Sequence, residues 1–531
     1  MKNRSFIVIA LIMCSGLFFS CNKTLSDQYL NPETSTQGSM GQLFTGMLLN
    51  NRIHSSYWDY YTFIVSITSN YSQMLAISPS DQMYVPNQSY KDARWNDFYD
   101  GSVGPASTSI DYRYSGPGIM ANYREMQRTY AGLSSTQQAS QYLYLQLGKI
   151  ILYDQAAQMI DLWGDIPFSQ ANSLNSSGGA NSSSARFDNA DTLYINIISS
   201  LDSLNTYLST TTAVAGLSSQ DLIYGGNLGN WRRYANSLRL RLLMRISNIN
   251  ETVAKAAVTN MLTNPSTYPL VDDNSYNAQL NQSPTTLISD LSGAFPTPVA
   301  PAYMLDTVMQ ASNDPRISVF WSPNKSGTYV GLPSNITATQ YTNATTNHTV
   351  STIDSVTFMY NYNVPGILFN AAETDLLKAE AMERWGLGDA SAPYYAALKQ
   401  SINFYYKINQ TAIMNGSTVQ EKPQTTPTDA TITAFLAQPG IVYANSTTQR
   451  LQQIYTQKWL NFFVLQAGQA WAEIRRTGYP KLPFLASSNS AYALPPQRLL
   501  YPIAEQTYNA TNYAQVASKD TRNTKIFWDA N

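Results

Sequence analysis

Apolar residues recur at helical spacing in the stretch around residue 150. Between Ser140 and Leu162 most of them fall three or four positions apart, which is the spacing of one buried face of an α-helix. Gly164, a residue type that often ends helices, and Pro167, a residue type that stops them, follow soon after. The pattern therefore predicts an amphipathic helix over residues 140–162.

The same spacing predicts further helices, most of them in neighbouring pairs. Asn230 closes a glycine-rich turn and is the candidate N-cap of one of them. Repeated antiparallel pairs are typical of tetratricopeptide architecture, although the sequence shows no clean repeat of about 34 residues. The predicted ranges are 191–208, 231–247, 251–262, 371–385, 392–406 and 447–476.

Segments rich in Asn, Ser, Thr, Tyr, Gly and Pro separate these helices. They cover residues 76–118, 265–300, 320–365 and 410–445, and irregular stretches of this length are often binding loops. An alternating run from Ser355 to Tyr360 predicts a minor strand. The expected fold class is mostly α, with helix pairs, long irregular loops and minor β-strands.

Residues 1–20 have the features of a secretory signal peptide. Lys2 and Arg4 precede an uncharged apolar stretch that is too short to span a bilayer comfortably. The segment Leu17-Phe18-Phe19-Ser20-Cys21 is similar to the box that is cleaved ahead of the lipid-modified cysteine in bacterial lipoproteins. The alternative is a plain signal peptide that is cleaved elsewhere.

The lipoprotein interpretation places the mature N-terminus at Cys21. Acyl chains on this cysteine would hold the protein on a membrane without a spanning helix. Residues 21–37 are polar and non-periodic, and we expect them to form a tether. The remaining residues, 38–531, are predicted to form a single domain.

Overall composition favours a binding protein for uncharged ligands. Only 13% of the residues are charged, and the charges are mixed in sign, so the chain has no basic stretch that would indicate a nucleic-acid partner. The 37 tyrosines, together with many amide and hydroxyl side chains, suit ring stacking and hydrogen bonding to neutral polar molecules.

Catalytic chemistry is poorly supplied. The two histidines, His54 and His348, lie outside any recognisable motif, which excludes histidine-based zinc sites and Ser-His-Asp systems. Cys14 lies within the predicted signal peptide, so the mature chain has no free thiol nucleophile. We therefore predict that the protein is not an enzyme and needs no cofactor.

Two kinds of acidic site have to be weighed against this conclusion. A glycoside hydrolase needs two carboxylates, and four are available in helices or at caps, where structural roles are more common. The cluster Asp272-Asp273-Asn274 offers oxygen ligands for calcium but lacks the spacing of an EF-hand, so a polar turn is favoured. The four carboxylates are Asp161, Asp165, Glu380 and Glu383.

Six blocks of sequence, in order, resemble the SusD/RagB family of outer-membrane nutrient-binding lipoproteins, in its SusD-like starch-binding branch. They are DLWGDIPF (161–168), NWRRYANSLRLRLLMRIS (230–247), NDPR (313–316), LLKAEAMERWG (376–386), QKWLNFF with WAEIRRTGYP (457–463 and 471–480), and LPPQRLLYPIAEQTYNATNY (494–513). The resemblance implies a mostly helical scaffold with tetratricopeptide-like pairs. It also implies a place on the outer face of the outer membrane and a SusC-like, TonB-dependent β-barrel as partner.

Most of these blocks are expected to be architecture. Trp231, Trp459 and Trp471 lie in predicted helices, where aromatic spacing usually indicates core. Arg475 and Arg476, at a helix C-terminus, are expected to complement the helix dipole and to meet carboxylates. The segment Asp314-Pro315-Arg316 is expected to be a turn with a buried ion pair.

Aromatic residues in the predicted loops are the candidate ligand contacts, because pyranose rings present apolar C–H faces that stack on Trp and Tyr. Trp95 and Trp321 are predicted to be the platforms, so alanine at either position should weaken ligand retention without unfolding the protein. Trp471→Ala should instead lower thermal stability. The complete predicted set is Tyr90, Trp95, Asn96, Tyr99, Trp321 and Tyr329.

The predicted function is surface capture of oligosaccharide for import through the barrel. One rival keeps the fold but changes the cargo to peptide or another nutrient. A second rival is a purely structural transporter subunit, in which the loop aromatics contact protein.

Overall fold

The computed structural model describes residues 39–101, 117–173, 184–280, 291–295, 298–414 and 421–531. The predicted signal peptide, Cys21 and the tether lie outside these described residues. Within them the chain is mostly helical, which confirms the predicted fold class. None of the helices in this described part combines the length and the apolar character that crossing a bilayer requires.

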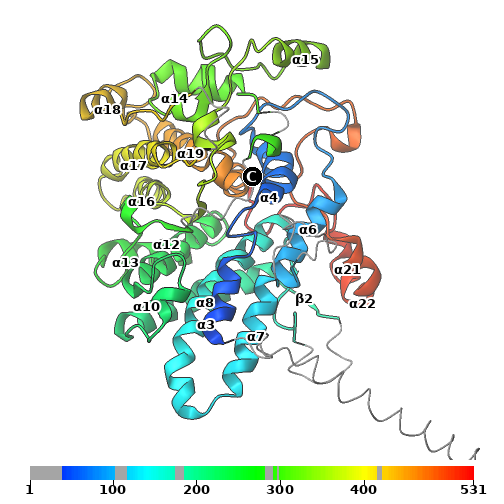
Figure 1. Ribbon diagram of the computed structural model, residues 1–531, viewed down its shortest axis with the longest axis vertical. Coiled ribbons are helices and arrows are strands. Elements are labelled where there is room, and N and C mark those ends of the chain that lie inside the picture. Colours follow the sequence, from blue (N-terminus) through cyan, green and yellow to red (C-terminus); the bar gives the residue numbers. More distant parts are fainter. Residues whose placement is uncertain (1–38, 102–116, 174–183, 281–290, 296–297, 415–420) are drawn as a thin grey trace, which may run out of the picture.

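Five helices follow one another along one side of the molecule (Figure 1). Neighbours in this row pack against each other, and the predicted pairs α12 with α13 and α16 with α17 are present. The five are α10 (Ala190–Thr210), α12 (Leu228–Ile246), α13 (Glu251–Thr263), α16 (Ala371–Trp385) and α17 (Ser391–Gln410). A second group, α3 (Met40–Leu48), α7 (Ile119–Ala131) and α8 (Ser135–Trp163), packs together at one end of the row.

Helix α8 confirms the prediction for residues 140–162 and begins one turn earlier. Ser134 is its N-cap, and the amide of Gly164 donates to the carbonyl of Ile160 at the other end. The predicted N-cap of α12 is wrong by one turn. Asn227, not Asn230, caps this helix, and its side chain accepts from the amide of Asn230.

The predicted single helix over residues 447–476 is interrupted. Helix α19 (Thr447–Phe462) and helix α20 (Ala467–Thr477) are separated at Phe463, whose φ is 36°. Non-glycine residues seldom adopt this left-handed region, so the surrounding structure has to hold it. The buried Phe463 ring stacks on Phe320 at 4.2 Å, and this packing accounts for the break.

The predicted strand over residues 355–360 is wrong. These residues form a short π-helical segment, η7 (Ser355–Met359), which Asp354 initiates by accepting from the Thr357 amide at 2.6 Å. A local cap therefore outweighs an alternating pattern of moderate β-propensity.

The long segments predicted to be irregular contain regular elements of their own. Helix α6 (Gln88–Tyr99), helix α15 (Ala338–Thr346) and helix α18 (Asp429–Leu436) lie within three of them. The described strands form three antiparallel pairs that fasten such segments to the helices. The pairs are β1 (Ile166–Pro167) with β2 (Phe187–Asp188), β3 (Ala278–Leu280) with β6 (Gly366–Phe369), and β4 (Trp321–Ser322) with β5 (Thr352–Ile353).

Two large hydrophobic clusters make up the core, and helices α16 and α20 contribute to both. Leu377 and Trp471 belong to the first cluster, and Leu376 and Ala470 to the second. The three tryptophans expected in the core, Trp231, Trp459 and Trp471, are 0%, 2% and 1% exposed, which confirms that prediction.

A buried cluster of charged side chains lies between the helices that join the two halves of the core. We refer to Glu380, Lys458, Glu473, Arg476 and Arg245 as the ion cluster. Lys458 Nζ lies 2.8 Å from Glu380 and 3.0 Å from Glu473, and Arg476 contacts both carboxylates at 2.6–2.8 Å. Arg245 Nη1, from α12, lies 3.0 Å from Glu473. The expectation that Arg476 meets carboxylates is confirmed.

A second expected ion pair is also present. Arg316 Nη2 lies 2.6 Å from Asp314 Oδ2, and both side chains are buried. Arg316 also donates to Ser401 and Gln457, so the turn that contains this pair is fixed to α17 and α19.

The ion cluster gives stability a defined pH dependence. Burial alone would raise the pKa of Glu380, but Arg476 and Lys458 more than offset it and lower the pKa to about 2, from an ordinary value of 4.5. A carboxylate whose pKa is depressed by folding contributes stability that is present above its unfolded pKa. That contribution is lost as the pH falls from about 4.5 toward 2.

We expect Glu380→Gln to lower the free energy of unfolding by about 3–5 kcal/mol at neutral pH, because it leaves Arg476 and Lys458 buried with one carboxylate fewer. Urea denaturation at a series of pH values measures this. The difference between wild type and variant should shrink below about pH 4.5. Glu125→Gln, which breaks an exposed pair with Arg128 on α7, is the control and should cost far less. Equal losses at both positions would contradict the interpretation.

Candidate functional site

Trp95 and Tyr99 do not lie in a loop, contrary to the sequence-based prediction. Both are in helix α6, where Asn87 accepts hydrogen bonds from the amides of Ser89 and Tyr90 and so begins the helix. Trp95 is 3% exposed, and its ring packs against Trp163 at 5.2 Å and Tyr501 at 5.8 Å. The Tyr99 hydroxyl donates to the carbonyl of Pro167 at 2.8 Å. Neither ring presents a surface to a ligand.

The prediction that Trp321 lies exposed in a loop is also wrong. It begins strand β4, is 0% exposed, and contacts the Phe463 ring at 5.2 Å in the second hydrophobic cluster. Large aromatic rings contribute most of their stabilising area when they are buried, and this ring fills the core beneath the break between α19 and α20. The prediction that it forms an exposed platform is corrected.

The remaining predicted residues reach the surface but do not form one site. Asn96 is exposed and Tyr90 half-buried on α6, and their separation of six positions directs them to different sides of that helix. Tyr329 is half-buried and packs at the edge of the second cluster. Burial, together with the nearby carboxylates Asp354 and Glu421, raises the pKa of Tyr329 to about 12. Ligand contact by these three residues stays a prediction.

Tyr90 belongs to a group of four half-buried rings that the structure brings together. We call Tyr57, Trp58, Tyr61 and Tyr90 the aromatic cluster. Tyr57 stacks on Tyr61 at 6.3 Å with an interplanar angle of 12°, and Trp58 contacts Tyr61 and Tyr90 at 5.7 Å each. Tyr61 and Tyr90 meet edge to face at 5.9 Å. The cluster offers adjoining aromatic surfaces that are partly open to solvent.

Three of these rings come from one short stretch of helix. Helix α4 (Tyr57–Asp59), capped by Ser56, runs directly into the π-helix η1 (Tyr60–Ser69). Positions 57, 58 and 61 face outward, while Tyr60 and Phe63, on the opposite side, are buried. The fourth ring is supplied by α6, which packs against η1. The run Tyr57-Trp58-Asp59-Tyr60-Tyr61 is the sequence feature that could have predicted this cluster. At helical spacing it places rings on two faces, one buried and one exposed.

Hydrogen-bonding groups border the rings. Burial and a hydrogen bond with Tyr61 raise the pKa of Tyr90, so two tyrosine hydroxyls meet at the edge of the cluster. A Cβ atom on Gly293 would lie 2.7 Å from the Tyr57 hydroxyl, so this ring is seated against backbone that leaves no room for a side chain. Apolar ring faces edged by hydroxyls suit a neutral polyhydroxylated ligand.

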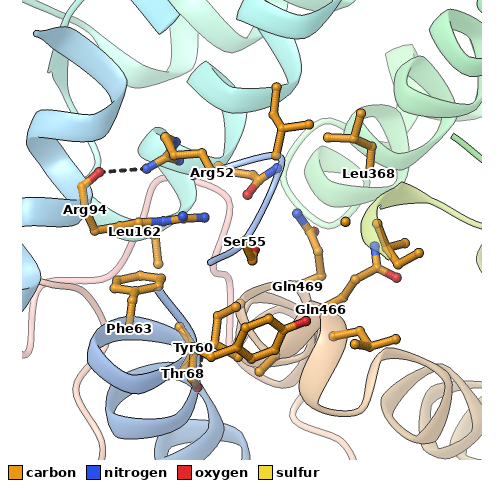
Figure 2. Close-up of a pocket in the computed structure, with 18 of the residues that line it drawn as sticks. Arg52, Ser55, Tyr60, Phe63, Thr68, Arg94, Leu162, Leu368, Gln466 and Gln469 are labelled. Carbon is orange, nitrogen blue, oxygen red and sulfur yellow. Dashed lines mark hydrogen bonds between the residues drawn. The ribbon is translucent and has the colours of Figure 1, made fainter. Parts of the chain in front are cut away.

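A small cavity lies on the inner side of η1, behind the aromatic cluster. It has a volume of about 70 Å³, and Figure 2 shows Arg52, Ser55, Tyr60, Arg94 and Gln469 around it. Small-molecule pockets usually measure about 300–1,000 Å³. The cavity is therefore too small for a sugar ring and large enough for a few waters or a small ion.

An open groove of about 600 Å³ runs between η5 (Tyr303–Met309) and α19. Tyr303 and Tyr479 are half-buried at this groove, and Gln449, Gln452 and Gln453 line it from one face of α19. Among the described residues that line the groove, none is charged. It is a second surface compatible with a neutral ligand.

The carboxylates that might serve a hydrolase are held in structural contacts. Asp161 accepts from Trp528 Nε1 at 2.8 Å, Asp165 from the Ala190 amide at 2.8 Å, and Glu383 from the Tyr443 hydroxyl at 3.0 Å, while Glu380 belongs to the ion cluster. The acidic turn behaves as predicted for a polar turn. Asp273 caps the short helix η3 (Asn274–Tyr276) by accepting from the Ser275 amide.

Comparisons with known proteins agree with this arrangement. A SusD-like family model, described as starch-binding and associating with the outer membrane, matches residues 37–502. A chitin-binding protein of solved structure superposes with a TM-score of 0.71 at 21% identity, covering 92% of this chain and 99% of that one. A comparison with the curated proteins found no significant match.

Two further solved structures are similar over nearly their whole length. A chitin-binding SusD homolog from Flavobacterium johnsoniae has a TM-score of 0.67 at 22% identity, with coverage of 93% of this chain and 99% of that chain. A SusD homolog from Bacteroides fragilis NCTC 9343 has a TM-score of 0.70 at 20% identity, with coverage of 92% and 99%.

The burial of the rings gives a prediction that replaces the one made from sequence. Trp95→Ala should lower the free energy of unfolding by about 3–5 kcal/mol, because it opens a cavity against Trp163 and Tyr501. Trp58→Ala, which removes a half-buried ring, should cost clearly less. Chemical denaturation of the two variants measures both values. A loss at Trp58 as large as that at Trp95 would mean that the aromatic cluster is part of the core.

Proposed function

Because this chain belongs to the SusD-like family of outer-membrane nutrient-binding proteins, we propose that it captures an uncharged oligosaccharide at the aromatic cluster. The family consists of binding proteins without catalytic activity, and the chain is accordingly a binding protein rather than an enzyme. The observation that carries the proposal is the group of four half-buried rings on α4, η1 and α6, with hydroxyls at their edges.

The chemistry of the cluster favours a sugar over a charged cargo. Stacking uses the apolar faces of the rings and needs no counter-charge, and the tyrosine hydroxyls at the ring edges are neutral hydrogen-bonding groups. Chitin and starch, which appear in the descriptions of the relatives and the family, are polymers of uncharged pyranoses. Maltohexaose and chitohexaose are therefore the first ligands to try.

We further propose that the captured sugar passes to a SusC-like, TonB-dependent barrel in the outer membrane. Supply to a transporter requires a ligand that is released as readily as it is bound, and a few stacked rings give modest affinity. In this proposal acyl chains on Cys21 hold the domain at the cell surface, and residues 21–37 act as the tether.

We expect Trp58→Ala to weaken oligosaccharide binding by about ten-fold or more, equivalent to about 1.4 kcal/mol, because Trp58 joins the rings of α4 to Tyr90. Isothermal titration calorimetry with maltohexaose and chitohexaose measures this. Tyr508→Ala removes an isolated tyrosine that is 84% exposed and is the matched control, with no expected effect.

Two other outcomes of that titration are informative. If Trp58→Ala binds normally and Tyr303→Ala does not, the ligand occupies the uncharged groove between η5 and α19 instead. If neither sugar binds the wild type but a peptide pool is enriched on it, the cargo is peptide and the proposed ligand class is wrong.

The anchor has its own test. Cys21→Ser should shift the protein from the membrane fraction to the soluble periplasmic fraction, because the modified side chain is lost while the signal peptide remains. Fractionation and metabolic labelling with a palmitate analogue measure the change. Retention of label in the variant would place the acyl chains elsewhere.

A further inference from the structure

The cavity behind the aromatic cluster combines apolar walls with a few buried hydrogen-bond donors. Arg52 and Arg94 are 4% and 7% exposed, yet neither guanidinium is fully paired. Arg52 donates from Nε to Gln155 and from Nη1 to the Arg94 carbonyl, each at 2.9 Å, while its Nη2 has no partner among the described residues. Buried polar groups normally find a partner, and an unpaired one is commonly explained by a water or an ion.

Arg94 is in a similar position. Its Nη1 lies 3.0 Å from Asp59 Oδ1, and its Nε has no partner within the described part of the chain. Among the described residues, Asp59 is the only carboxylate at salt-bridge distance from either guanidinium. Arg94 therefore has a carboxylate at salt-bridge distance, whereas Arg52 is influenced by the buried carboxylates Asp97, Asp59 and Asp154 without such a contact among the described residues.

Gln469 adds a donor whose direction is fixed. Its Oε1 accepts from Arg245 Nη2 at 2.7 Å, so the other end of the amide, the Nε2 group, is the part left for the cavity. Figure 2 shows Gln469 and Arg94 on opposite sides of the cavity with Ser55 between them. Tyr60 also lines the space, and burial raises the pKa of its hydroxyl, which keeps it a donor.

The acidic group in the lining does not compensate for these donors. Asp161 is turned to other partners, because it accepts from Trp528 Nε1 at 2.8 Å and lies 3.6 Å from Arg245. Burial and the neighbouring Arg94 lower the pKa of Arg52 well below its usual range, and the carboxylates Asp97, Asp59 and Asp154 offset only part of that effect. The interior around this cavity thus favours the arrival of negative charge.

We propose that this cavity is a binding site for one small oxoanion, held by the guanidiniums of Arg52 and Arg94 and by the amide of Gln469. A carboxylate or sulfate offers several acceptor oxygens to donors that converge from different sides. Its charge would pair with Arg52, and the volume of about 70 Å³ limits the ligand to a group of this size. The oxoanion is a small anion that is free in solution.

Thermal unfolding of the full mature protein tests the proposal. Sodium acetate and sodium sulfate should each raise Tm by about 2 °C or more over sodium chloride at the same ionic strength, because a ligand that binds only the folded state stabilises it. Sodium glucuronate forms a third arm. Its ring is too large for the cavity, so glucuronate should shift Tm no more than chloride does, and a shift as large as that with acetate would contradict a site for a small oxoanion.

Two variants in the cavity and one control variant show whether the Tm shift arises at this site. Gln469→Glu keeps an acceptor for Arg245 but replaces the inward donor with negative charge, and should abolish the anion-specific shift. Arg52→Met should do the same. Arg124→Met is the control, since every donor group of Arg124 is already paired, with the carbonyls of Ala171, Phe168 and Ser169 and with Gln127.

Comparing the variants distinguishes binding in the cavity from a general effect of salt on stability. An anion-specific shift in wild type and Arg124→Met that is absent from Gln469→Glu supports the site, even if Arg52→Met does not fold. Shifts no larger than those of chloride, or equal shifts in wild type and Gln469→Glu, overturn it. Sugar binding at the aromatic cluster is measured separately and does not enter this result.

Discussion

Charge pairing inside the protein is the constraint on which the arrangement of helices depends. Glu380 from α16 and Glu473 from α20 are both contacted by Lys458 of α19 and Arg476 of α20, and Arg245 brings α12 into the same group. Buried charges of this kind tolerate only a narrow geometry, since a displaced partner leaves a desolvated charge behind. Helices α12 and α16 are therefore held against the neighbouring helices α19 and α20 at one place in the core.

Helix α20 connects the ion cluster to the aromatic cluster at the surface. It packs against η1 on one side, and its Gln469 closes the small cavity beneath that helix. The outer side of the same short stretch carries Tyr57, Trp58 and Tyr61. The positions of these exposed rings therefore depend on α20, which the ion cluster fixes in the core.

The sequence predicted the long helices well because their apolar spacing is a strong and local signal. Helix α16 was expected over residues 371–385 and forms there, since Asn370 caps it and the left-handed Gly386 ends it. Breaks imposed by tertiary packing were not predictable in this way. Nothing local distinguishes Phe463 from its neighbours, because its backbone is held by rings such as Phe320 that are remote in sequence.

The candidate site was the least predictable feature, for a related reason. Trp95 and Trp321 lie in segments of polar composition, which suggested exposure, but Trp163, Tyr501 and Phe463 cover their rings. Tyr90 was among the predicted ligand contacts and lies half-buried on α6, whereas its partners Tyr57, Trp58 and Tyr61 were not predicted. Their mutual contact depends on how α6 crosses η1, and a single sequence carries no direct record of that crossing.

The stacked pair Tyr57 and Tyr61 has a kinetic consequence. Because the two rings stack on each other, their side-chain rotamers are already restricted before a ligand binds. Binding then costs little further side-chain entropy, and we expect ligand to associate and dissociate quickly without a conformational change. Rapid exchange of this kind would suit the proposed passing of sugar to a transporter.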